Sequence, residues 1–122
     1  MPHTENGSAD LALSSLIDTL DECVGELERA RKRANALRED RQSGRTWLDI
    51  VSGEERPLVV ESISTVLNCL ATTGSVWRRE QAAALQGEDV SINRIAAMFG
   101  VTRQRISALL REREEAAAVP GD

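Results

Sequence analysis

The chain has 122 residues, of which 41% are hydrophobic and 29% are charged, and its net charge at pH 7 is -5. This length allows one compact domain, or a small domain with an extended element, but excludes two full cores. The composition excludes a disordered chain, and two cysteines with one histidine exclude a disulfide framework and a zinc site, so we expect no metal.

The residue composition predicts an all-α fold. Ala, Leu, Arg and Glu are abundant, and only three residues are aromatic. No uncharged run is long enough to cross a bilayer, and the polar start MPHTENGSAD lacks the apolar core of a signal peptide. We therefore expect a cytoplasmic protein without membrane contact. The excess of arginine, 14 residues against one lysine, indicates a GC-rich bacterial genome by association only.

A polar tail at residues 1–9, expected to be disordered, precedes the first long element. From residue 10 to 42, apolar and small side chains recur at alternating spacings of three and four, which is the heptad pattern of a coiled coil. A lone helix cannot bury so long a stripe, so we predict that it dimerises with a second copy of itself. The predicted dimerisation residues are Leu13, Leu16, Leu20, Cys23, Leu27, Ala30, Ala34 and Leu37.

Other partners for this helix remain open. Ile17 and Val24 widen the stripe, which also suits packing onto the protein's own C-terminal helices as a bundle member. The charge is uneven, because residues 1–30 hold seven acids and one base, whereas residues 31–46 hold six bases and two acids. The acidic half suits a basic protein partner. The basic half is expected to be a solvated helix face, with contact to DNA phosphates as the alternative.

Residues 43–56 contain two glycines and are predicted to be a linker with one short helical turn. A helical domain is predicted from 57 to 115. Pro57 suits the first turn of a helix that Gly74 closes, and a second helix follows up to Gly87. The last residues, 116–122, are expected to be a disordered tail.

Residues 91–111 hold four arginines and no acid. Ser91 has the side chain of a helix N-cap, Gly100 interrupts the apolar periodicity, and Thr102 suits the cap of a following helix. Two short helices joined by a glycine turn predict a helix-turn-helix at 92–113. The apolar positions expected to pack between its helices are Ile92, Ile95, Ala96, Phe99, Val101, Ile106, Leu109 and Leu110.

Residues 75–113 resemble the helix-turn-helix of bacterial transcription regulators, and FGVTRQRIS is similar to the promoter-reading segment of the main bacterial family of sigma factors and of many small repressors. The resemblance implies that the helix 102–113 enters the major groove of DNA. Arginine, glutamine and serine are suited to base edges. The predicted base-reading residues are Arg103, Gln104, Ser107, Ala108 and Arg111, and the predicted contacts to the DNA backbone are Thr102, Arg105, Arg94, Arg78 and Arg79.

These observations predict a sequence-specific, DNA-binding transcription regulator of the bacterial nucleoid, a dimer that reads double-stranded DNA through two copies of the helix 102–113. The alternative is a coiled-coil interaction module that binds another transcription regulator or a sigma factor. A third interpretation makes the two short helices a plain αα-hairpin with solvated arginines. The chain has no phosphate-binding glycine loop and no nucleophile paired with a histidine, so we expect neither an enzyme nor a cofactor.

Overall fold

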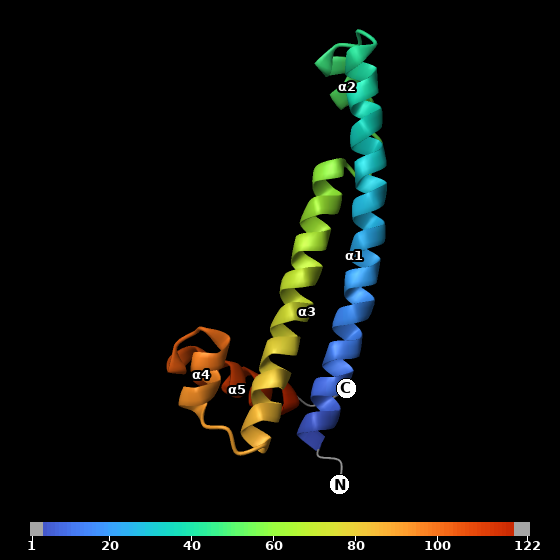
Figure 1. Cartoon of the computed structure of the whole chain (residues 1–122). Helices are drawn as coiled ribbons and strands as arrows, with labels where there is room; N and C mark the ends of the chain where they lie inside the picture. The colour runs from blue at the N-terminus through green and yellow to red at the C-terminus, as the bar shows by residue number, and fades with distance from the viewer. Residues whose placement is uncertain (1–3, 119–122) are drawn as a thin grey trace. The chain divides into compact units, whose positions relative to one another are not determined.

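The computed structural model describes residues 4–118, with the side chains of residues 7–117. This part of the chain is all-helical, which confirms the predicted fold class and the long N-terminal helix (Figure 1). None of its helices is long and apolar enough to span a membrane. The five helices are α1 (Thr4–Gln42), α2 (Trp47–Gly53), α3 (Val59–Gly87), α4 (Ile92–Phe99) and α5 (Arg103–Ala118).

The chain is divided into two compact units, and the division differs from the predicted one. One unit combines the chain up to Ile17 with the chain from Thr72 onward, and the other unit is Asp18–Ala71. Both boundaries therefore fall inside helices, α1 and α3. The predicted linker at 43–56 lies within the second unit and contains α2.

In the unit Asp18–Ala71, α1 and α3 run side by side in opposite directions as a helical hairpin (Figure 1). The buried side chains of this unit are small or medium in size. Cys23 and Ala30 are buried on α1, Ser62 and Val66 are buried on α3, and α2 adds Ile50, which is 3% exposed. Small side chains at these positions allow two helices to approach closely.

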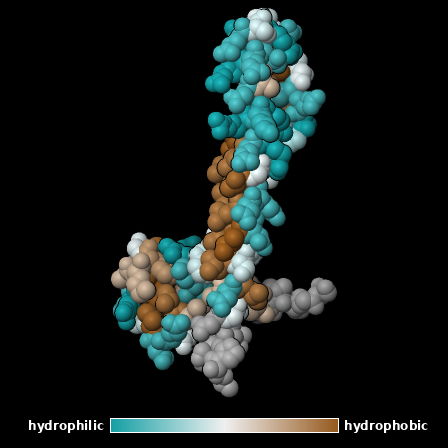
Figure 2. All heavy atoms as spheres, turned by 45° about the vertical axis from the view of Figure 1, so that its right-hand side comes forward, coloured by the Kyte–Doolittle hydropathy of each residue, from teal (hydrophilic) through white to brown (hydrophobic). Residues whose placement is uncertain are grey.

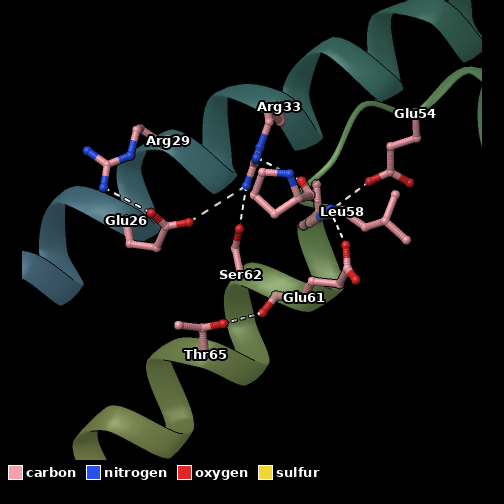
Figure 3. Close-up of polar contacts among 10 residues, drawn as sticks. Glu26, Arg29, Arg33, Glu54, Leu58, Glu61, Ser62 and Thr65 are labelled. Atoms are coloured by element: carbon pink, nitrogen blue, oxygen red, sulfur yellow. Dashed lines mark hydrogen bonds and ion pairs between the residues drawn. The ribbon is translucent and has the colours of Figure 1, made fainter.

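A partly buried polar contact fixes how the two helices of the hairpin align (Figure 3). The Arg33 guanidinium donates hydrogen bonds to the Ser62 hydroxyl at 2.5 Å and to the Pro57 carbonyl at 2.8 Å, and it lies 3.9 Å from the Glu26 carboxylate. A hydrogen bond from Ser62, and then one from Arg29, lowers the pKa of Glu26. Because a buried hydroxyl without partners is costly, sliding the helices past one another is disfavoured.

Two glutamates satisfy the backbone N–H groups at the start of α3 (Figure 3). The N–H of Val59 donates to Glu54 at 2.9 Å, and the N–H of Leu58 donates to Glu61 at 2.8 Å. The Leu58 bond, together with the adjacent Arg56, lowers the pKa of the Glu61 carboxyl. The helix α3 therefore begins at Val59. Pro57, which the sequence predicted to lie in its first turn, precedes the helix by two residues.

Three boundaries differ from the predictions. The helix α1 begins at Thr4, so residues 4–9 of the predicted tail are helical, and Ala9 and Ala12 are buried in the same stretch. The helix α3 continues through Gly74, because one glycine costs a helix only about 1 kcal/mol and the buried Ala82 and Ala83 extend its packing. The helix α5 ends at Ala118, and residues 1–3 and 119–122 of the predicted tails lie outside the described residues.

Candidate nucleic-acid interface

The end of α3, together with α4 and α5, encloses an apolar core. Its innermost residues are between 0% and 5% exposed, and they come from all three helices: Ala82, Ile95, Ala96, Ile106 and Leu109. Partly buried residues pack around them: Leu85, Val90, Ile92, Phe99 and Leu110. The predicted packing is confirmed at every position except Val101. That residue is 40% exposed because it lies in the turn, where its N–H bonds to the Ala96 carbonyl at 3.0 Å.

The turn between α4 and α5 has the local geometry that the sequence predicted. The Ser91 hydroxyl accepts the N–H of Arg94 at 3.2 Å, and the Thr102 hydroxyl accepts the N–H of Arg105 at 3.1 Å. Gly100 ends α4 in the left-handed region at φ 68 and ψ 34. A residue with a Cβ adopts that conformation only at a cost, so glycine is required here for the chain to turn sharply.

The outer face of α5 gathers most of the predicted base-reading residues. Arg103, Gln104, Ser107 and Arg111 line one shallow, open pocket. The side chains of Arg103, Gln104 and Arg111 are exposed, and that of Ser107 is half-buried. Ala108 is half-buried and does not line this pocket. Because the opposite side of α5 is held in the core, these side chains are presented along one fixed edge.

Positive charge dominates the surroundings of this edge. Arg94 and Arg105 are exposed, and Thr102 is exposed while its hydroxyl caps α5. One guanidinium nitrogen of Arg105 lies 3.9 Å from the carboxylate of Glu112, and both side chains are about half exposed. An ion pair this long and this exposed contributes little, so Arg105 remains available to another anion.

The two arginines predicted on α3 have different surroundings. The guanidinium of Arg78 stacks on the ring of Phe99 at 4.0 Å and donates to Gln81 at 3.2 Å. Its side chain is exposed and held in place beside α4. Arg79 is half-buried, with its Nε 4.0 Å from Glu80, and is therefore less available to a phosphate.

One residue that positions this surface was missed by the sequence analysis. The Nε of Arg113 donates to both carboxylate oxygens of Glu80, at 2.9 and 3.0 Å, and thereby ties α5 to α3. Both side chains are partly buried, which strengthens a charge-assisted hydrogen bond. The two residues are 33 positions apart, and no spacing in the sequence connects them.

The predicted dimerisation stripe is split between two environments. Cys23 and Ala30 are buried within the hairpin. At these two positions the structure differs from the predicted seam between two chains and agrees with the alternative, in which α1 packs on its own chain. Burial, with smaller contributions from Cys69 and Glu22, raises the pKa of the Cys23 thiol. Leu16 and Leu37 are half-buried. The other half of the stripe is exposed: Leu13, Leu20, Leu27 and Ala34.

Among the residues whose side chains are described, no group of three or more His, Cys, Asp or Glu could hold a metal ion. Comparison with known proteins found no family model, no curated protein and no solved structure that matches this chain.

Proposed function

We propose that this protein is a dimeric, sequence-specific, DNA-binding transcription regulator of the bacterial cytoplasm and nucleoid. In this proposal α4, the turn at Gly100 and α5 form a helix-turn-helix, and α5 is the recognition helix. One observation carries the proposal: Arg103, Gln104, Ser107 and Arg111 share the exposed face of a helix whose other face is locked in a core.

The chemistry of this face suits the major groove. Arginine bonds bidentately to the O6 and N7 atoms of guanine, glutamine bonds to the N6 and N7 atoms of adenine, and serine bonds to either base. Arg103 and Gln104 occupy the first two positions of α5, which is the end of a recognition helix that contacts base edges. Arg111 lies two turns further along and suits the far end of the groove.

The charge distribution supports the same orientation. Residues 91–111 contain no carboxylate that would repel phosphates, and the exposed Arg94 and Arg105 are suited to the DNA backbone. Arg78 is held against Phe99 and is a further candidate for a phosphate contact. The remaining acids of the chain reduce indiscriminate binding to nucleic acids.

The direct test is selection of binding sites from a pool of random duplexes with the purified protein. We expect enrichment of a consensus made of two half-sites related by two-fold symmetry, because each copy contributes one recognition helix. Recovery of no sequence preference at moderate salt would contradict sequence-specific reading.

Substitution then assigns the reading edge. Arg103→Ala and Gln104→Ala should each weaken binding to the selected duplex by roughly 5- to 150-fold, the effect of losing one bidentate base contact, measured by fluorescence anisotropy. Arg56→Ala removes one exposed positive charge from the other unit, outside both basic stretches, and is the matched control. Equal losses in Arg103→Ala and in the control, with no loss in Gln104→Ala, would indicate general electrostatic attraction instead of base reading.

A second candidate function is an interaction module for another transcription regulator or a sigma factor. The exposed leucines of α1 and the acidic first thirty residues favour it, because they suit an apolar and basic protein surface. Salt distinguishes the two functions. Affinity for a duplex should fall steeply as the salt concentration rises, whereas a mainly apolar protein contact should change little.

A further inference from the structure

The hairpin of the unit Asp18–Ala71 has two unlike faces. One face has a groove whose walls include the side chains of Glu22, Glu26 and Thr65. At roughly 100° of rotation per residue, Leu20 and Val24 lie on the other side of the buried Cys23 from those glutamates. Figure 2 shows an apolar band along the hairpin. We call this band the apolar face, and its residues are Leu20, Val24 and Leu27 on α1 and Val60, Ile63 and Leu67 on α3.

The size of the apolar face is that of a protein interface. Its six side chains are between 42% and 64% exposed. With roughly 200 Å² for a fully exposed residue of this size, they leave on the order of 600 Å² in contact with water, against ~800 Å² that each partner contributes to a standard interface. An apolar patch this large on a chain this small marks an interaction site.

We propose that a second copy of this chain covers the apolar face, so that two hairpins pack face to face as an antiparallel four-helix bundle. This inference specifies how the two copies of the proposed dimer pair. It rests on the proposed function only in that the function requires a dimer. It also changes the predicted seam. The contact is made by residues of α1 and α3 together, and not by the buried Cys23 and Ala30.

The charges beside the apolar face identify a second copy as the occupant. Within this unit, α1 carries five acids and no base from Asp18 to Glu28, and six bases and two acids from Arg29 to Gln42. In an antiparallel pair, the acidic part of α1 in one copy lies beside the basic part in the other. A parallel pair would instead bring like charges together. The charge pattern of α1 is therefore complementary to itself in one orientation only.

The closing experiment measures mass in the absence of DNA, by sedimentation equilibrium at micromolar concentration. The wild-type protein should sediment at twice the chain mass of 13.3 kDa. Leu20→Glu and Leu67→Glu, one on each helix, should each raise the dissociation constant of the dimer at least about 100-fold, because each charge is buried twice in a symmetric interface. Circular dichroism checks that both variants remain helical.

The matched control is Leu11→Glu on the same helix. Leu11 is 74% exposed and lies nine residues from Leu20, on the opposite side of α1. The Leu11→Glu variant should still sediment at twice the chain mass. A monomeric wild-type protein, or a dimer that Leu20→Glu and Leu67→Glu leave intact, would overturn the proposal.

The orientation is tested by a pulsed electron resonance distance between spin labels on Gln42→Cys in a Cys69→Ser background. An antiparallel pair separates the two ends of α1 by well over about 20 Å, at about 1.5 Å per residue. A distance below about 20 Å would indicate parallel helices and would overturn the antiparallel arrangement.

The DNA readout keeps the two proposals separable. Arg103→Ala and Gln104→Ala should weaken duplex binding and leave the mass doubled, because they lie outside the apolar face. A protein that forms the dimer through this face but binds no DNA would refute the DNA-reading function alone. A protein that binds DNA as a monomer would refute the dimer alone.

Discussion

The core formed by α4, α5 and the end of α3 differs from the hairpin of α1 and α3 in where the large apolar side chains lie. In the unit that contains α4 and α5, Ile95, Ile106 and Leu109 are between 0% and 1% exposed. In the hairpin, small residues such as Ala30 lie inside, while leucines such as Leu67 are up to 61% exposed. The first core is completed by one chain. The hairpin, in contrast, has an apolar face that is in contact with water when the chain is alone. This difference predicts how each region responds to substitution.

The largest effect on stability should come from the closed core. Ile95→Ala should lower the free energy of unfolding by about 2–4 kcal/mol, because the cavity lies among side chains that cannot collapse fully onto it. Urea unfolding followed by circular dichroism measures the change. Met98→Ala on the same helix is the control, since Met98 is 58% exposed and should cost less than about 1 kcal/mol. Equal costs would mean that this core is not closed in solution.

A smaller effect should come from the turn. Gly100→Ala should cost about 1 kcal/mol or slightly more, because alanine at φ 68 is strained although nothing lies within 4 Å of its added Cβ. Gly100→Asn should cost less, since asparagine tolerates the left-handed region better. The same unfolding measurement ranks the two variants. If alanine proved neutral, the left-handed cap would not be a requirement of the turn.

The smallest effect concerns pH and the open hairpin. The pKa of Glu26 is lowered in the folded protein, chiefly by Ser62 and then by Arg29, so its contribution is present above the ordinary pKa of glutamate and disappears as the pH falls through the folded pKa. Glu26→Gln should therefore reduce stability at pH 7, and its difference from the wild-type protein should shrink on acidification. Thermal melts at several pH values test this sign. Glu28→Gln, at an exposed glutamate of the same helix, should follow the wild-type profile.

The sequence predicted the region around α4 and α5 well because its signals are local. A cap at Ser91, a glycine at Gly100 and a cap at Thr102 each depend on the few residues beside them. The apolar residues Ile95 and Ile106 then fall on the inner faces at helical spacing. Four of the five residues predicted to read bases came together on one face for the same reason.

The hairpin was harder to predict because its contacts are between residues distant in sequence. A heptad stripe shows that α1 needs a partner but does not identify it, so the sequence left open whether Cys23 is buried by a second copy or by the same chain. The contact from Arg33 to Ser62 in the hairpin spans 29 positions. Outside the hairpin, the contact from Arg113 to Glu80 spans 33 positions and was missed for the same reason. The prediction that a helix ends at Gly74 was wrong for a related reason. Packing along α3 outweighs the weak preference of one glycine for a helix end.

The boundaries between the two units have a practical consequence. They lie within α1 and within α3, so no exposed loop separates one unit from the other. A protease that cuts at loops cannot release either unit intact, and a shortened gene that encodes only one of them must end in the middle of a helix. Biochemical dissection of this protein is therefore better done by point substitution than by truncation.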